Sequence, residues 1–226
     1  VWVYEKETHL PVFTKFFIEM GRGNGKDGFI APLVNFLQTP LHNIKNYHCE
    51  IVGNSEDQVK DTFNVVYEVM KTDKFKNTFN VTKELITNKT TGANLRYNTS
   101  NAKTKDGKKI GCLIFNELHA YENFEQINVF ESALGKIENP REFIITTNGY
   151  VRDGPLDELE TMMNEILTTG ENPLRYFPFI CKADKVKDDR LGDDDVQHQA
   201  NPSMEFLPNL ERQIKKLREK ISNYED

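Results

Sequence analysis

One short glycine-rich loop restricts the fold of this chain more than any other sequence feature. The loop reads GRGNGK at residues 21–26, and it follows a β-branched and aromatic stretch at residues 12–20. An amphipathic stretch at residues 27–38 comes next and stops near Pro40. This order predicts a strand, a tight turn and a helix. Glycines let the backbone N–H groups of such a turn point together at an anion in front of the helix, so we expect a phosphate-binding turn.

Apolar segments of strand length alternate with helical segments along most of the chain. Further strands are predicted at residues 47–52, 110–116, 142–147 and 176–181. Further helices are predicted at residues 55–70, 124–136 and 156–167 and from residue 208 onward. The first of these helices opens with a capping box made by Ser55 and Gln58. Strands that alternate with helices predict an α/β fold, in which helices flank a mostly parallel central sheet.

The character of the chain changes after about Pro173. Residues 184–195 are strongly acidic and predict a solvated loop, and the last helix follows it with one apolar seam. The chain has 226 residues, which is long enough for one large domain with a small appendage. We therefore expect a nucleotide-binding domain at residues 1–170 and a linker subdomain with a C-terminal helix at residues 171–226.

Composition excludes several classes of protein. The net charge of −6 argues against a nucleic-acid binder that is basic over its whole surface, although a local patch stays possible. Lys103, Lys105, Lys108 and Lys109 could form such a patch or a plain solvated hairpin tip. No apolar run approaches the roughly 18 residues of a membrane span. Three cysteines without a CxxC pair argue against a disulfide framework or a zinc site and fit a reducing cytoplasm.

The glycine-rich loop is close to the P-loop pattern GxxxxGK[ST]. Lys26 supplies a charge for the β- and γ-phosphates of a nucleotide, and Arg22 supplies a second cation. Met20 replaces the first glycine, and Asp27 replaces the hydroxyl residue that usually holds Mg²⁺. A glycine turn that merely caps a helix is the alternative. The residues predicted to bind the nucleotide are Gly21, Arg22, Gly23, Asn24, Gly25, Lys26 and Asp27.

The segment GCLIFNELH at residues 111–119 has the form of a Walker B element. Four apolar residues predict a buried central strand, and a polar pair follows at its carboxyl end, where open α/β sheets bind ligands. Glu117 would polarise the attacking water. Asn116 stands where an Asp usually meets Mg²⁺, so Asn116 and Asp27 are the predicted metal ligands. A strand that simply ends in a turn is the alternative, and His119 is interpreted as a structural hydrogen-bonding residue.

A third apolar strand ends in small polar side chains at Thr146, Thr147 and Asn148. Hydroxyl groups at such a strand end can sense a γ-phosphate and pass its loss to a neighbouring element. The alternative is an ordinary threonine-rich strand end that leads into the turn at Gly149.

Together these segments resemble a known family. The series GRGNGKDGF, GNSEDQVKDTF, LIFNELHAYE, IITTNGYVRDGPLDE, YFPFICKAD and ANPS resembles, in order and spacing, the large terminase subunit of tailed phages from about residue 12 to 205. The resemblance implies a P-loop NTPase fold of the ASCE type and an ATP-hydrolysing motor that requires Mg²⁺. By position it makes Lys26 the Walker A lysine, Arg22 the loop arginine and Glu117 the catalytic glutamate. Thr146, Thr147 and Asn148 match the coupling motif.

The resemblance also implies partners and a place of action. It implies double-stranded DNA as cargo, a portal and a small terminase subunit as partners, and a homo-oligomeric ring in the host-cell cytoplasm. We expect no membrane contact. No nuclease-type cluster of acids follows the ATPase segments, so the nuclease domain of such proteins is expected to be absent from this chain.

Several alternatives stay open at the sequence level. Arg96 is a candidate for an arginine finger offered to a neighbouring subunit, and Arg152 is another; both could equally be surface arginines. A different DNA-dependent P-loop ATPase, such as a helicase, would share Lys26 and Glu117. A catalytically impaired nucleotide-binding assembly module is the third hypothesis, because Asn116 and Asp27 could weaken turnover. From the sequence, Asn116→Asp is expected to preserve or raise Mg²⁺-dependent hydrolysis.

Overall fold

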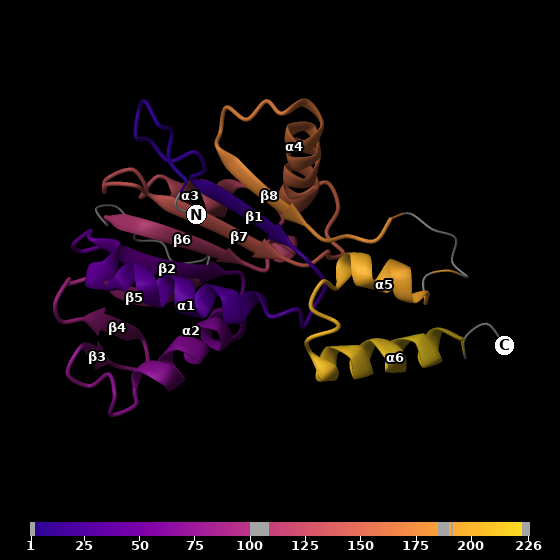
Figure 1. The fold of residues 1–226 in the computed structure, drawn as a ribbon, viewed down its shortest axis with the longest axis horizontal. Coiled ribbons are helices and arrows are strands. Elements are labelled where there is room, and N and C mark those ends of the chain that lie inside the picture. The colour runs from indigo at the N-terminus through magenta and orange to yellow at the C-terminus, as the bar shows by residue number, and fades with distance from the viewer. Residues whose placement is uncertain (1–2, 100–108, 185–189, 191, 223–226) are drawn as a thin grey trace.

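The computed structural model describes residues 3–99, 109–184, 190 and 192–222. Its described residues form one eight-stranded sheet with the order β3-β4-β5-β2-β6-β7-β1-β8 (Figure 1). The strands are β1 (Lys15–Glu19), β2 (His48–Gly53), β3 (Phe79–Val81), β4 (Leu85–Asn88), β5 (Asn94–Thr99), β6 (Ile110–Asn116), β7 (Arg141–Thr146) and β8 (Tyr176–Ile180).

The sheet is mostly parallel, as predicted. β1 pairs in parallel with β7 on one side and with β8 on the other, and β6 pairs in parallel with β7 and β2. β3, β4 and β5 are joined by antiparallel pairing, which accounts for the irregular residues 75–110. The carboxyl ends of β1, β7 and β6 therefore lie at one edge of the sheet, and the segments that follow these strands come together there.

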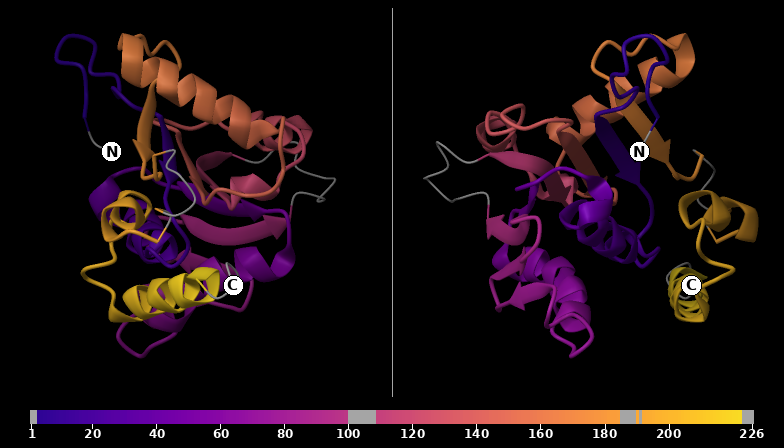
Figure 2. Two further views of the ribbon diagram at one scale, coloured as in Figure 1. Left: turned by 90° about the vertical axis from the view of Figure 1, so that its right-hand side faces the viewer. Right: turned by 60° about the vertical axis from the view of Figure 1, so that its left-hand side comes forward.

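Helices cover both faces of the sheet (Figure 2). One face is covered by α1 (Lys26–Gln38) and α2 (Glu56–Met70), and the other by α3 (Glu125–Glu131) and α4 (Pro155–Thr169). Neighbouring residues of one strand enter different cores: Phe16 packs with α1 and α2, whereas Phe17 packs with α3 and α4. This two-sided burial explains why all seven residues of β6 are buried. Two short 3₁₀ helices, η1 (Pro40–His42) and η2 (Leu118–Ala120), complete this part.

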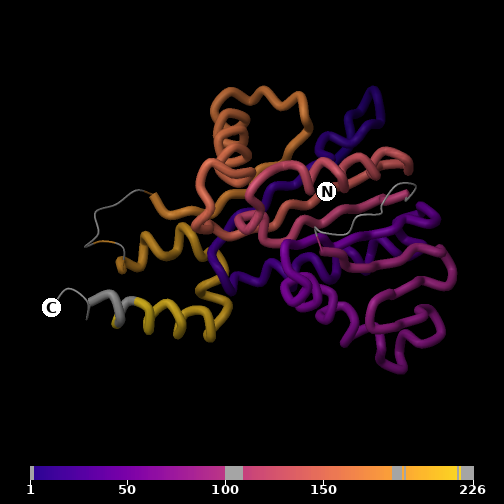
Figure 3. The backbone as a smooth tube through the Cα atoms, turned by 180° about the vertical axis from the view of Figure 1, so that it is seen from behind, coloured from indigo at the N-terminus to yellow at the C-terminus, as the bar shows by residue number. Residues whose placement is uncertain are grey.

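Two C-terminal helices lie apart from the sheet (Figure 3). They are α5 (Asp194–Ala200) and α6 (Pro208–Ser222), and Met204, Leu210 and Ile214 form a small core of their own. β8 falls after the predicted boundary at residue 170 but belongs to the main sheet through β1. The main sheet therefore continues beyond residue 170, and the separate C-terminal part begins after β8.

Several element ends differ from the sequence-based prediction for physical reasons. The third helix was expected to reach residue 136, but α3 ends at Glu131, and Gly135 turns the chain with a φ of 82°. The acidic segment was expected to be a loop, but α5 begins inside it at Asp194, and residues 185–189 and 191 lie outside the described part. The predicted cap of α2 is present, since Ser55 Oγ accepts a hydrogen bond from Gln58 N at 3.4 Å. No helix among the described residues is long and apolar enough to cross a membrane.

Candidate nucleotide site

The phosphate loop joins the carboxyl end of β1 to the N-terminus of α1 (Figure 1). Gly23 and Gly25 adopt φ angles of 79° and 84°, a region that other residues enter at a cost. Gly25 is the N-cap of α1, and no side chain caps the helix. The first N–H groups of α1 are therefore available to a ligand, and the helix dipole favours an anion there.

Lys26 is buried at the base of this loop. Lys26 is only 7% exposed to solvent. Its Nζ donates to the carbonyl oxygens of Met20 at 3.4 Å and Gly21 at 3.3 Å. Burial lowers the pKa of Lys26, and the nearby Arg22 acts in the same direction, whereas the carboxylates of Glu117 and Asp27 oppose the shift. A cation held in poor solvation gains most from a new anionic partner such as phosphate.

Glu117 lies at the end of β6 in a strained backbone conformation. Its φ and ψ are 52° and 57°, and its N–H donates to Ile145 O at 2.8 Å, which ties the turn to β7. The carboxylate contacts His119 Nδ1 at 3.0 Å and accepts from Thr147 Oγ1 at 3.3 Å. Burial alone would raise the pKa of Glu117, but the His119 hydrogen bond and the charge of Lys26 outweigh it and lower the pKa. Glu117 is therefore ionised and able to accept a proton from water.

Lys26 and Glu117 shift each other's pKa, which shows that the two charged groups are near one another. The two residues are 91 positions apart (117 − 26) but lie close enough for each to stabilise the charge of the other. Both residues lie at the carboxyl edge of the sheet, where Lys26 follows β1 and Glu117 follows β6. The sequence predicted both residues at this edge of the sheet, and their shared action on one nucleotide stays a prediction.

The two predicted metal ligands meet at one hydroxyl group. Thr62 Oγ1, from the buried face of α2, donates to Asp27 Oδ1 and accepts from Asn116 Nδ2 at 3.0 Å. Asn116 Nδ2 also donates to Gln58 O at 3.3 Å. Thr62 was not predicted as a site residue, because it lies on the buried stripe of α2 between Val59 and Phe63 and resembles an ordinary core position.

The chemistry of this group fits Mg²⁺. A carboxylate from Asp27, an amide oxygen from Asn116 and a hydroxyl from Thr62 are the hard oxygen donors that Mg²⁺ prefers. The described residues contain no group of three or more His, Cys, Asp or Glu side chains that could hold a metal by themselves. Mg²⁺ usually keeps water and substrate phosphates among its ligands, so a partial protein site next to a phosphate loop is the expected form.

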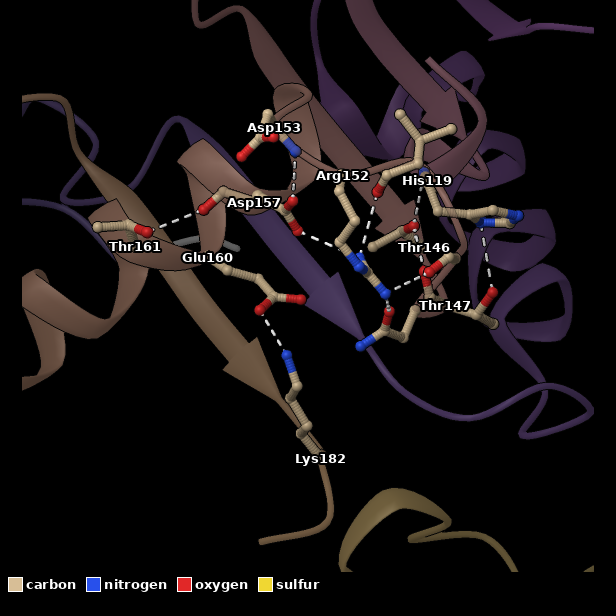
Figure 4. Close-up of polar contacts among 12 residues, drawn as sticks. His119, Thr146, Thr147, Arg152, Asp153, Asp157, Glu160, Thr161 and Lys182 are labelled. Carbon is tan, nitrogen blue, oxygen red and sulfur yellow. Dashed lines mark hydrogen bonds and ion pairs between the residues drawn. The ribbon is translucent and has the colours of Figure 1, made fainter. Parts of the chain in front are cut away.

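The end of β7 connects Glu117 to α4. Thr146 Oγ1 accepts from His119 N at 3.0 Å, and Thr147 Oγ1 contacts His119 Nδ1 at 3.3 Å (Figure 4). Thr147 Oγ1 also donates to Glu117 Oε2 at 3.3 Å. A Cβ on Gly149 would lie 2.6 Å from the His119 ring, so this close approach requires glycine. Both predicted coupling hydroxyls therefore touch the Glu117–His119 pair.

Arg152 holds the loop that follows the coupling residues. It donates to Asn148 Oδ1 at 3.2 Å and to Gly149 O at 2.7 Å, and it pairs with Asp157 in the first turn of α4 at 3.3 Å (Figure 4). This places the third predicted coupling residue, Asn148, in contact with a side chain that also binds α4. Arg152 is thus engaged within its own chain.

The structure does not bring Arg96 to the phosphate loop. Arg96 lies in β5 and pairs with the buried Glu50 of β2 at 3.3 Å, directly across the parallel register. Strands β2, β6 and β7 separate β5 from β1. Its role toward a neighbouring subunit stays a prediction. Arg22, by contrast, is exposed and close enough to Lys26 to lower its pKa.

These features define the class of the protein. A phosphate loop follows β1, an acidic residue follows β6, and β7 lies between these two strands. That order is the arrangement of a P-loop ATPase of the ASCE type, as the sequence predicted.

The family follows from a direct comparison. Residues 2–165 match the family model described as "Terminase large subunit, ATPase domain", and the chain belongs to this family. Members of the family hydrolyse ATP, so the domain is an ATP-binding hydrolase. No match was found among curated proteins.

The solved structure of one large terminase shows the same fold, and a second terminase domain was also matched. The large terminase of bacteriophage HK97 aligns with a TM-score of 0.78 and 18% identity, over 93% of this chain and 43% of that chain. The large terminase ATPase domain of Thermus phage P74-26 aligns with a TM-score of 0.45 and 17% identity, over 62% of each chain. The present chain therefore spans less than half the length of the HK97 protein.

Proposed function

We propose that this chain is the motor part of a viral packaging terminase, which couples ATP hydrolysis to the translocation of double-stranded DNA into a procapsid. The observation that supports the proposal is that Lys26 and Glu117 lie at one edge of the sheet and stabilise each other's charge, while Thr147 contacts Glu117. A site of this kind can hold a triphosphate, activate water and report the loss of the γ-phosphate through β7.

Different residues of the chain would bind the phosphates, orient the attacking water and hold the metal ion. Lys26 and the free N–H groups of the loop bind the phosphates, and Arg22 adds charge at the open side. Glu117 accepts a hydrogen bond from the attacking water, while His119 and Thr147 fix the orientation of its carboxylate. Asp27, Asn116 and Thr62 would hold Mg²⁺, which when bound neutralises charge on the phosphates.

An apolar cavity next to the loop is suited to the base of the nucleotide. It has a volume of about 510 Å³ and is continuous with the loop residues Asn24, Gly25 and Lys26. Aromatic side chains line it, among them Phe16, Phe29, Phe143, Phe177 and Phe179. A planar base can stack on such rings, and its burial there would complement the polar contacts of the phosphates.

The proposed partners follow from family membership. They are double-stranded DNA, a portal, a small terminase subunit and further copies of the chain in a ring, all in the host-cell cytoplasm. The net charge of −6 favours DNA contact through local basic groups rather than a whole surface. Lys103, Lys105 and Lys108 lie outside the described residues, whereas Lys109 is described and exposed.

Phosphate release tests the proposal directly. The chain should release phosphate from ATP in the presence of Mg²⁺, and a complete terminase that carries this chain as its ATPase domain should make DNA resistant to nuclease when procapsids are added. Unwinding of duplex DNA without packaging would favour the helicase alternative. Binding of ATP without phosphate release would favour the impaired module, for which the neutral Asn116 is the supporting observation.

Asn116→Asp separates stability from metal binding. The amide nitrogen donates to Thr62 and Gln58 O, and a carboxylate cannot replace either bond. We expect the variant to lose about 1–3 kcal/mol of unfolding free energy. We also expect tighter Mg²⁺ binding, because the charge of a carboxylate suits a hard cation, and hydrolysis that is preserved or raised.

Chemical denaturation and titration of Mg²⁺ in the presence of ADP measure these two effects. Asn116→Ala is the matched control, since it removes the same donors without adding a ligand. The control should lose similar stability and bind Mg²⁺ no better than the unchanged protein. Weaker Mg²⁺ binding by Asn116→Asp than by Asn116→Ala would contradict the assignment of Asn116 to the metal site.

A further inference from the structure

The phosphate loop is held from outside by a segment that is distant in sequence. We call residues 200–203, with the sequence ANPS, the clamp segment. Gly21 N donates to Ala200 O at 2.8 Å, and Asn24 Nδ2 donates to Asn201 Oδ1 at 2.8 Å. Ser203 N donates to Asn24 Oδ1 at 3.1 Å, and Ser203 Oγ donates to Asn24 O at 3.0 Å. The clamp segment begins at the last residue of α5 and leads to α6 (Figure 1).

These contacts use the polar atoms of Asn24 almost completely. Besides its bond to Asn201, Nδ2 donates to Gly21 O at 3.0 Å, which closes the loop internally. Asn24 and Asn201 are only 5% and 7% exposed, so water cannot readily replace a lost partner. A buried network in which every member is satisfied fixes one geometry, and loss of a single member leaves others unpaired.

The clamp segment orients two peptide units of the loop. In a planar trans peptide, the C=O and the following N–H point in opposite directions. Because Ser203 Oγ binds the carbonyl of Asn24, the N–H of Gly25 must point away from the clamp segment. Because Gly21 N binds Ala200 O, the carbonyl of Met20 points away as well, and Lys26 Nζ donates to it.

The clamp segment packs so closely against Gly21 that a side chain at this position would not fit. Its φ is not among the positive values, so backbone conformation alone does not require glycine there. A Cβ at this position would collide with Asn201 Oδ1 and lie 3.0 Å from Ala200 O. The first glycine of the loop is therefore explained by contact with the clamp segment.

The same segment is fixed to the C-terminal helices. Asn201 Nδ2 donates to Gln197 O of α5 at 2.9 Å. Leu210 of α6 lies over the loop, since a Cβ on Gly23 would be 3.2 Å from its Cδ1. Leu210 also packs with Met204 and Ile214. A shift of the loop backbone therefore displaces the anchor points of α5 and α6.

We propose that Asn201 and Ser203 are positioning residues for the phosphate loop, and that they link nucleotide occupancy to the placement of α6. The inference rests on the proposed nucleotide site. Linkage of this kind is reciprocal: if the clamp segment favours the binding-competent loop, bound nucleotide must favour the clamped position of α6 by the same factor. The chain can thereby transmit the state of its ATP site to whatever follows α6.

Asn201→Ala tests the inference with two readouts. The affinity for ADP with Mg²⁺, measured by calorimetry, should fall roughly five- to fiftyfold. Hydrogen exchange of the α6 amides should slow when ADP binds to the unchanged protein, and this response should be lost in the variant. The double variant Asn24→Ala/Asn201→Ala should weaken ADP binding by less than the product of the two single effects, because both substitutions remove the same Asn24–Asn201 hydrogen bond.

Asn172→Ala is the matched control, since Asn172 bridges backbone atoms of Tyr176, donating at 2.6 Å and accepting at 2.9 Å. It should lower stability without changing ADP affinity or the response of α6. The inference would be overturned if Asn201→Ala bound ADP as tightly as the unchanged protein. It would also be overturned if Asn172→Ala weakened ADP binding as much as Asn201→Ala does. If the unchanged protein itself binds no ADP, the nucleotide site fails, and the inference falls with it.

Discussion

Replacement of Lys26 by alanine is expected to weaken ATP binding about thirtyfold or more. Loss of one partner from a desolvated charge pair typically costs 2–5 kcal/mol or more, which corresponds to factors of about 30 to several thousand. Lys26 is buried beside the loop, and its charge is poorly compensated until a phosphate arrives. Calorimetric titration with ATP and a phosphate-release assay measure the effect.

The stability of this variant separates site loss from unfolding. The pKa of Lys26 is lowered in the folded protein, so the native environment disfavours its charged form relative to the unfolded chain. Removal of the ammonium should therefore leave the free energy of unfolding unchanged or increase it. Lys60→Ala, at a partly exposed position of α2 with an ion pair to Glu56, is the control and should bind ATP normally. ATP binding by Lys26→Ala within a factor of two of the control would exclude the P-loop assignment.

Glu117→Gln should separate binding from hydrolysis. The substitution keeps the size of the side chain but removes the carboxylate that accepts a proton from water. We expect the rate of phosphate release to fall roughly 10²–10⁴-fold, the usual contribution of a general base. ATP affinity should stay equal or become slightly tighter, because a negative charge near the phosphates is lost. Single-turnover phosphate release and equilibrium binding measure these two effects.

Glu125→Gln provides the comparison for this experiment. Glu125 is exposed in the first turn of α3, and its carboxylate is not among the groups that shift the pKa of Lys26. This variant should hydrolyse ATP at the rate of the unchanged protein. If Glu117→Gln also retained that rate, another residue would have to activate the water, and the interpretation of β6 as a Walker B strand would be wrong.

The sequence predicts those parts of the molecule that local patterns determine. β6 was predicted with its observed bounds, because a run of buried residues ends abruptly at Asn116 and Glu117. The position of Glu117 near Lys26 also followed, since parallel strands bring their carboxyl ends to one edge. These inferences needed only the period of the apolar residues and the order of the elements.

Contacts between distant segments could not be predicted in this way. Asn24 and Asn201 are 177 positions apart, and no local rule connects a loop amide with the end of α5. The pairing of Arg96 with Glu50 depends on the register between β5 and β2, which the irregular residues 75–110 conceal. Thr62 became recognisable only when the sheet placed α2 beside both Asp27 and Asn116. The pattern of apolar residues predicts helices and strands, whereas the contacts between distant side chains become known only from the tertiary structure.

The position of β8 determines where this protein can be divided. The family match ends at residue 165, but β8 comes later and hydrogen-bonds to the outer side of β1. A polypeptide that ended at residue 165 would lack β8, and β1 would become the edge strand of the sheet. The unpaired N–H and C=O groups of an edge strand can pair with other chains. It would also lose the acceptor for Gly21 N and the partners of Asn24. A piece that keeps these contacts to the phosphate loop therefore extends at least through Ser203.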